Sequence, residues 1–321
     1  MGLLALLTGS FALGRLSVVP STVEDADTAV AVEDSERNEA EAYRFISPLL
    51  QCENAQPGSF QHIRRARASV NSVIEEAKKR GDISMAAVYY RDLNNGPWFG
   101  ENEGEPFFPA SLLKVPLLLT YLREAESNPA ILQRKIVYDG APFPITQNYV
   151  FGEPLKSGRA YSVKELLEKM ILTSDNTAMG ILTSEELVSD AQLERVYKGF
   201  AIDSPSREGY RINPVTYASF FRVLYNATYL SRDLSEYALE LMSHSDFNEG
   251  LRSGVPLNIP ISHKFGERYH DQTGERQLHD CGIVYVPGKP YLICVMTRGS
   301  DFKHLSAVIG EISKQVYTSL R

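Results

Sequence analysis

The chain has 321 residues, of which 43% are hydrophobic and 10% aromatic, and its formal net charge is −7. A chain this long and apolar can bury a large core, which excludes a wholly disordered protein. Residues 24–41 hold eight acidic residues and one basic residue, so the remaining body is nearly neutral. A body without a basic stripe argues against nucleic acid as a partner.

Residues 1–20 form an apolar run broken by Arg15. This run is short for a transmembrane helix and fits a secretory signal or signal anchor, with a buried N-terminal helix as the alternative. Residues 21–58 form an acidic linker, which has no aromatic residue before residue 43 and is too polar to fold alone. We therefore expect an exported protein, periplasmic or at the cell surface. It should be a monomer that meets the membrane only through its N-terminal segment.

The three cysteines lack the paired spacing of a zinc site, so we expect no metal. Cys281 and Cys294 lie in apolar runs, where a thiol behaves as a small buried hydrophobe. We favour this reading, and a disulfide between neighbouring strands is the alternative.

The apolar spacing of residues 60–79 predicts an amphipathic helix. Two strands joined by a tight hairpin should follow at 85–93 and 97–101. Residues 110 to about 245 are helical in pattern, with a capping box at Ser162 and Glu165.

Three more strands are expected at 261–267, 279–286 and 291–297, before a last helix at 302–320. This order predicts an α+β fold, in which an antiparallel five-stranded sheet is flanked by helices and joined to an all-helical lobe. Residues 59–321 would form one catalytic domain, and a cleft between its lobes would hold the site. The predicted α/β lobe takes about 59–109 and 215–321, and the helical lobe takes about 110–214.

Ser111 and Lys114 are three positions apart at the start of a predicted helix, so their side chains can touch. A serine hydroxyl needs a base, and a lysine can be that base if its pKa is depressed. The alternative is a helix N-terminus with a solvated lysine.

Two further motifs follow. Ser174-Asp175-Asn176 comes after a predicted apolar helix, where a helix end or turn is the alternative. Lys264-Phe265-Gly266 lies on a predicted strand, where the alternative is an ordinary polar strand residue followed by a bulge.

Taken in this order, the three motifs resemble the Ser-x-x-Lys, Ser-Asp-Asn and Lys-Thr-Gly set of class A β-lactamases and penicillin-binding proteins. Residues 213–218 also resemble a helix start in the class A enzymes, and the resemblance covers about residues 60–321. It implies a β-lactamase/transpeptidase-like fold that needs no cofactor.

The resemblance also implies roles. Ser111 would attack a carbonyl, neutral Lys114 would accept its proton, and Ser174 beside Lys264 would pass a proton to the leaving nitrogen. Asn176 would hold a substrate amide.

The resemblance further implies that the backbone N–H groups of Ser111 and Glu267 stabilise the oxyanion. On the strand itself, Gly266 would let the substrate come close.

Two departures from the family pattern stand out. Only 37 residues separate Asn176 from Pro214, and they contain no match to the Glu-x-x-x-Asn pattern that supplies the deacylating base in class A enzymes. Glu208 in this loop could replace that base, although we expect it at the surface. Phe265 replaces a Thr or Ser that binds a substrate carboxylate, a loss that Lys264 and Arg268 could partly offset.

The expected function is that of a serine hydrolase that forms an acyl-enzyme on Ser111 and opens a β-lactam amide, with slow turnover. One alternative is a D,D-peptidase acting on peptidoglycan stem peptides. The other is a sensor or binding domain that is acylated without turnover. The partner in each case is a small-molecule β-lactam or a peptidoglycan peptide.

Overall fold

The computed structural model describes residues 43–48, 59–94, 96–141, 143, 147–184, 187–200, 202–203 and 209–320. Residues 43–321 belong to one compact unit. The predicted signal segment, most of the acidic linker, Cys52 and Glu208 lie outside the described residues. Within the described ranges, no helix combines the length and apolar character needed to span a bilayer.

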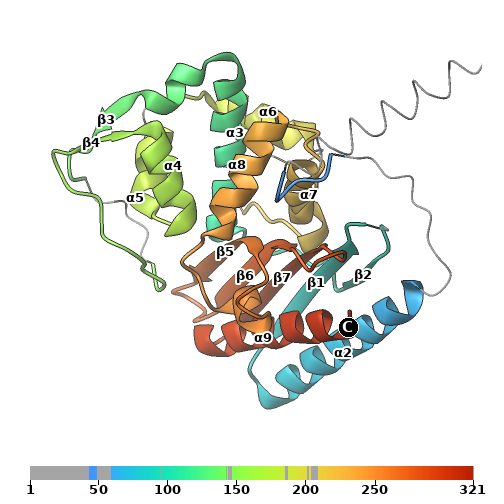
Figure 1. Cartoon of the computed structure of the whole chain (residues 1–321). Helices are drawn as coiled ribbons and strands as arrows, with labels where there is room; N and C mark the ends of the chain where they lie inside the picture. Colours follow the sequence, from blue (N-terminus) through green and yellow to red (C-terminus); the bar gives the residue numbers. More distant parts are fainter. Residues whose placement is uncertain are drawn as a thin grey trace, which may run out of the picture. The chain divides into compact units, whose positions relative to one another are not determined.

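A five-stranded antiparallel sheet with the strand order β2-β1-β7-β6-β5 forms the centre of the molecule. This confirms the predicted fold class. Strand β5 is at one edge, beside the helical lobe (Figure 1). The strands are β1 (Met85–Asp92), β2 (Trp98–Glu101), β5 (Ile261–Tyr269), β6 (Arg276–Val284) and β7 (Tyr291–Gly299).

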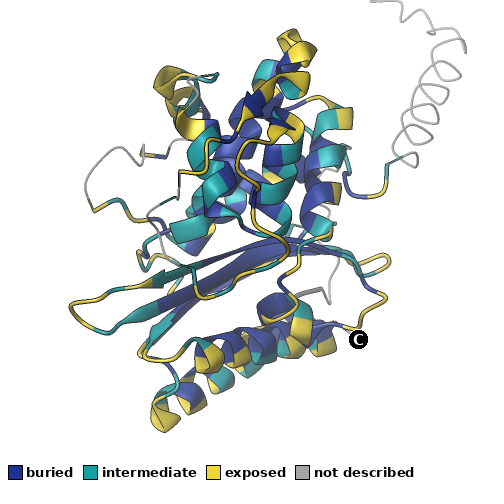
Figure 2. Cartoon of the chain, turned by 90° about the vertical axis from the view of Figure 1, so that its left-hand side faces the viewer, coloured by how far each residue is buried: buried dark blue, intermediate teal, exposed yellow. Residues whose placement is uncertain are grey.

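Helices α2 (Ser59–Arg80) and α9 (Phe302–Ser319) lie side by side across one face of the sheet (Figure 1). Their apolar residues recur at helical spacing and are buried against the sheet, whereas the outward surfaces of both helices are exposed (Figure 2). The two terminal helices of the domain therefore cover the same face of the sheet, which the sequence had predicted only to be flanked by helices.

The opposite face of the sheet carries the helical lobe, whose buried side chains form a second core cluster with those of β1, β6 and β7. In the described residues this lobe also contains a short hairpin of β3 (Lys135–Val137) and β4 (Ala160–Ser162). Its helices are α3 (Lys114–Ser127), α4 (Val163–Leu172), α5 (Asn176–Ser184), α6 (Asp190–Gly199), α7 (Pro214–Tyr225) and α8 (Arg232–Ser243). Short 3₁₀ turns are η1 (Ala110–Leu113), η2 (Pro129–Gln133) and η3 (Gly250–Gly254).

The predicted capping box is present at the start of α4. Ser162 accepts a hydrogen bond from the Glu165 backbone N–H, and the Glu165 carboxylate accepts one from the Ser162 backbone N–H. These bonds satisfy N–H groups that a helix start leaves unpaired. They fix where α4 begins, and therefore where the turn after α4 places Ser174.

Residues 43–48 pack on the helical lobe although they fall inside the predicted linker. The Glu236 carboxylate on α8 accepts hydrogen bonds from the backbone N–H groups of Arg44, Phe45 and Ile46. The side chains of Phe45 and Ile46 are buried. This short segment thus belongs to the folded body, because it supplies apolar surface and satisfies its backbone there.

Cys281 and Cys294 form a disulfide, so the preference for two reduced, buried thiols was wrong. The two residues are direct partners on β6 and β7, with their Cα atoms 3.9 Å apart. The apolar sequence context predicted burial correctly, since both residues are fully buried. It could not reveal the strand register that places the two sulfur atoms face to face.

This disulfide should stabilise the fold measurably. Replacing both cysteines in a Cys281→Ser, Cys294→Ser protein should lower the free energy of unfolding by about 3 kcal/mol, because a short closed loop is lost from the unfolded state. Urea unfolding with and without reductant would measure this. Equal midpoints for the reduced and oxidised wild-type protein would contradict the assignment.

Candidate active site

Ser111 lies in η1, immediately before α3, and it is partly accessible to solvent. The preceding residue, Ala110, has φ 50°, a left-handed conformation that costs free energy for a residue with a Cβ atom. Lys114 is the first residue of α3 and is fully buried. The turn thus presents the hydroxyl to solvent and sends the lysine inward.

Ser174 and Asn176 flank the junction between α4 and α5. Ser174 has φ 55°, and it is the second strained backbone position in the site. Asn176 is the first residue of α5, and both side chains are buried. Strain of this kind persists only where the surroundings enforce it, and it is common at functional sites.

The Lys114 amine joins these segments. Its Nζ lies 3.0 Å from Ser111 Oγ and 3.1 Å from Ser174 Oγ. It also lies 2.6 Å from the Ser174 carbonyl oxygen and 2.7 Å from Asn176 Oδ1. The carbonyl and amide oxygens can only accept hydrogen bonds, so the two N–H groups of a neutral amine would be used on them. The nitrogen lone pair would then remain for a serine hydroxyl.

Lys264 approaches Ser174 from the other side of the site. Its Nζ lies 2.9 Å from Ser174 Oγ and 2.8 Å from the Phe265 carbonyl oxygen. Ser174 Oγ therefore lies between two lysine amines. A hydroxyl in this position can accept a hydrogen bond from one amine and donate to the other.

Burial governs the protonation of both lysines. Desolvation lowers the pKa of Lys114 to about 7, against the opposing charges of Asp175 and Glu267. Desolvation and the charge of Lys114 also lower the pKa of Lys264 well below its ordinary value. A buried lysine with a pKa near 7 is available as a base at neutral pH.

Gly266 brings β5 against the turn that carries Ser111. A Cβ atom at this position would lie 2.8 Å from the Pro109 carbonyl oxygen and 3.1 Å from the Leu112 backbone nitrogen. A glycine at this position therefore makes room for the protein's own backbone, and the expected approach of a substrate to Gly266 stays a prediction. This contact sets the distance between β5 and the turn that carries Ser111.

The side chain of Glu267 holds a loop of the helical lobe against β5. Its Oε1 accepts hydrogen bonds of 2.9 Å from the backbone N–H groups of Asn148 and Tyr149. Its Oε2 is buried and has no hydrogen-bond partner among the described residues. The charge near the lysines and the position of this loop both depend on Glu267.

Gln147 is a site residue that sequence reasoning missed. Its Nε2 donates to the Ser174 carbonyl oxygen at 2.8 Å, and its Oε1 accepts from the Asn176 backbone N–H at 3.3 Å. It supports the strained Ser174 turn from the loop between β3 and β4. No motif or periodicity surrounds Gln147, so the sequence carried no signal for this contact.

Phe265 is fully buried in an aromatic cluster at the edge of the sheet. Its ring stacks on that of Phe247, with 4.2 Å between the ring centroids, and it contacts the rings of Tyr149 and Phe151 edge-on. The Lys264 amine lies 4.2 Å from the ring centroid. Phe265 thus supplies apolar surface that helps to desolvate Lys264, where a Thr or Ser would supply a hydroxyl.

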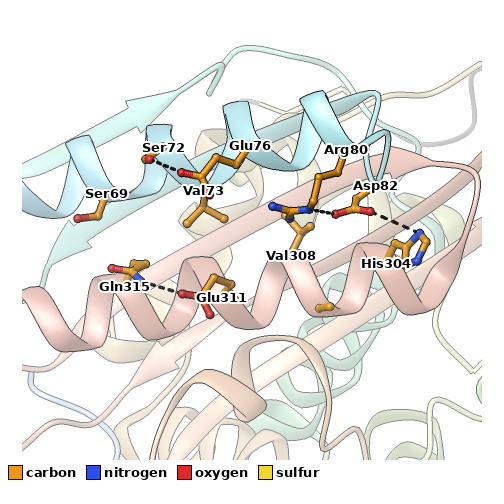
Figure 3. A pocket seen from close by; sticks show the side chains of 11 residues that line it. Ser69, Ser72, Val73, Glu76, Arg80, Asp82, His304, Val308, Glu311 and Gln315 are labelled. Carbon is orange, nitrogen blue, oxygen red and sulfur yellow. Dashed lines mark hydrogen bonds and ion pairs between the residues drawn. The ribbon is translucent and has the colours of Figure 1, made fainter.

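A hollow of about 590 Å³ lies between α2 and α9 on the far face of the sheet (Figure 3). Its polar side chains bind one another: Arg80 pairs with Asp82 at 2.7 Å, and Gln315 donates to Glu311 at 2.7 Å. These contacts leave few polar groups for a ligand. The described residues also contain no group of three His, Cys, Asp or Glu side chains that could hold a metal ion.

Replacing Gly266 with Ala should displace Ser111 without unfolding the protein. The added methyl group would push η1 away from β5, and a shift of about 1 Å in a reacting group costs about 100-fold in rate. The rate at which a phosphonate ester labels Ser111 would measure the loss, and circular dichroism would confirm the fold. Unchanged labelling would show that this contact does not position Ser111.

The fold is shared with solved structures of β-lactamases and of a penicillin-binding protein. A β-lactamase from Chitinophaga pinensis DSM 2588 aligns with a TM-score of 0.68 and 22% identity, covering 80% of this chain and 99% of that one. PBP-A aligns with a TM-score of 0.65 and 21% identity, covering 79% and 96%. A PBP-A variant solved as an acyl-enzyme complex with penicillin G aligns with a TM-score of 0.64. These likenesses establish the fold.

No protein in the curated set matches the sequence significantly. The model of the beta-lactamase enzyme family, however, matches residues 65–320. This match includes every residue of the three motifs and nearly all of the described body. The chain therefore belongs to the beta-lactamase enzyme family.

Proposed function

We propose that this protein is a serine hydrolase that forms an acyl-enzyme on Ser111 and opens the amide of a β-lactam ring. The observation that carries the proposal is the environment of the Lys114 amine. Two obligate acceptors, the Ser174 carbonyl oxygen and Asn176 Oδ1, lie within 2.7 Å of Nζ and direct its lone pair toward the hydroxyls. Burial lowers the pKa of the amine to about 7, so a substantial fraction of it is neutral at neutral pH.

The acylation step follows from this geometry. Lys114 accepts the Ser111 proton while Oγ attacks the carbonyl carbon, and the carbonyl becomes an oxyanion. The backbone N–H groups of Ser111 and Glu267 stabilise this charge in the proposal. The C–N bond then breaks, and the nitrogen takes a proton from Ser174 Oγ. Ser174 regains a proton through its contacts with Lys114 and Lys264.

The chain between Asn176 and Pro214 favours a second candidate, a D,D-peptidase acting on peptidoglycan stem peptides. It lacks the glutamate pattern of class A enzymes, and Glu208, the candidate replacement, lies outside the described residues. Acylation needs the lysines and serines, whereas hydrolysis of the acyl group also needs an activated water. Slow deacylation is consequently part of the proposal, and a non-turnover sensor is its limiting case.

We further propose that the protein works outside the cytosol, attached through its N-terminal segment. The apolar run at residues 1–20 supports export. The Cys281–Cys294 disulfide also supports it, since such bonds persist mainly in oxidising compartments. Fractionation of cells expressing the full chain tests this assignment.

Benzylpenicillin should add one acyl group to the protein, at Ser111. Intact-mass measurements over time, with lactam absorbance recorded in parallel, would follow both steps. A transient adduct with steady lactam loss indicates a β-lactamase, and a persistent adduct indicates the peptidase or sensor. The Ser111→Ala protein should form no adduct, and an adduct in that variant would refute the nucleophile assignment.

Acylation should accelerate as the pH rises through about 7. The lowered pKa of Lys114 means that the neutral, proton-accepting form becomes the major one above this pH. At Lys114 the folded protein also binds fewer protons than the unfolded chain between about pH 7 and 10.5, so the contribution of this group to the free energy of unfolding should rise over that window. Stopped-flow acylation rates test the first statement, and a flat profile from pH 5.5 to 8.5 would rule out Lys114 as the base.

A further inference from the structure

Two arginines sandwich Phe108, three residues before the nucleophile. The guanidinium carbon of Arg211 lies 2.8 Å from the ring centroid, and that of Arg268 lies 3.2 Å from it. Two groups this close to one centroid would overlap on a single face, so they occupy opposite faces. Arg211 precedes α7, Arg268 is on β5, and Phe108 belongs to the segment leading into η1.

Strand β5 shows on which side of Ser111 this sandwich lies. Lys264, Gly266 and Arg268 are every second residue of β5, so all three lie on one face of the strand. Each is about 6.6 Å from the next one in the set. Lys264 binds Ser174, Gly266 contacts the nucleophile turn, and Arg268 reaches Phe108. Arg268 is thus on the opposite side of the Ser111 turn from Lys264. Its expected part in offsetting the missing Thr or Ser hydroxyl stays a prediction.

The guanidinium groups keep most of their hydrogen-bonding capacity. Stacking uses the flat face of a guanidinium and leaves its in-plane N–H groups free. Arg268 donates to no other described residue, and Arg211 donates only through Nη1, to the carbonyl oxygens of Gly209 and Tyr210. Neither arginine forms an ion pair with a described carboxylate.

The local charge is positive. Burial and the charges of Arg268 and Arg298 lower the pKa of Arg211, so the cations are close enough to destabilise one another. Glu275 is the acid that acts on both sandwiching arginines, and its Oε1 already accepts a hydrogen bond from Gln277 at 2.7 Å. An added anion would therefore relieve repulsion and gain charge-assisted hydrogen bonds.

We infer that Phe108, Arg211 and Arg268 form a binding subsite for a carboxylate on the acyl half of the substrate. The inference rests on the proposed function, in which the leaving nitrogen is on the Lys264 side. The half of the substrate that stays bound to Ser111 then extends toward Arg268. A carboxylate there would accept hydrogen bonds from both guanidinium groups, while the Phe108 ring fixes their planes.

Three penicillins that differ only in the substituent on the α-carbon of the acyl side chain test this subsite. The α-carbon carries hydrogen in benzylpenicillin, a carboxylate in carbenicillin and an ammonium group in ampicillin. Dissociation constants measured by calorimetry on the Ser111→Ala protein report binding without acylation. Acylation rates of the wild-type protein provide the second readout and test the proposed function separately.

Carbenicillin should bind the Ser111→Ala protein about tenfold more tightly than benzylpenicillin, and ampicillin should bind most weakly. Adding Arg211→Gln and Arg268→Gln should abolish this preference. Arg268→Glu should make ampicillin bind more tightly than carbenicillin. A variant that had merely lost its fold could not gain affinity for ampicillin. Arg64→Gln, on the exposed side of α2, removes the same charge far from the site and should retain the preference.

Equal affinities for the three penicillins, or a carbenicillin preference that survives in the double arginine variant, would overturn the subsite. Binding with the predicted preference but without acylation of the wild-type protein would support the subsite while refuting the proposed function. Acylation by benzylpenicillin without any preference for carbenicillin would support the proposed function while refuting the subsite. Raising the salt concentration should weaken the preference, since the attraction is between charges.

Discussion

Burial of the Lys114 amine is the constraint on which the rest of the site depends. A charged lysine without solvent is costly, so this position is tolerable only where the amine is surrounded by oxygen atoms and can release its proton near neutral pH. The oxygen atoms come from η1, from the strained turn at Ser174 and from the start of α5. The need to satisfy one nitrogen therefore fixes three segments of chain relative to one another. The left-handed conformations of Ala110 and Ser174 are part of the cost of that arrangement.

Strand β5 determines the layout of the site. Every second residue faces the site: Lys264 contacts Ser174, Gly266 contacts the η1 backbone, and Arg268 contacts Phe108. The intervening residues, Phe265 and Glu267, hold the loop that carries Gln147 and Tyr149. One strand thus spaces Lys264, Gly266 and Arg268 along the site, and the same strand anchors the loop that supports Ser174. This dual use explains how a family motif can tolerate Phe265, because at this position the ring fills an apolar cluster and desolvates Lys264.

Much of the fold was predictable because it depends on local signals. The capping box at Ser162 marked the start of α4, and periodicity marked α2, α9 and the strands to within a few residues. The three motifs were predictable as a set, since each is a short run with a recognisable spacing, and the structure brings Ser111, Lys114, Ser174 and Lys264 together. The cysteines were misjudged because an apolar context indicates burial equally well for a thiol and for a disulfide. Gln147, Phe108 and Arg211 went unnoticed as site residues because their partners are far away along the chain.

The sequence by itself determined the elements and, through their order, the α+β class, and it singled out Ser111, Lys114, Ser174 and Lys264 as a set, because local periodicity and short motifs carry these signals. Only the tertiary structure decided which side chains share an environment. The pKa of Lys114 reflects burial by segments some 60 residues away, and the pairing of Cys281 with Cys294 reflects the register of β6 against β7. The two arginines beside Phe108 come from the ends of separate elements. Contacts of this kind depend on how the layers pack, and packing is a property of the whole chain that local spacing does not encode.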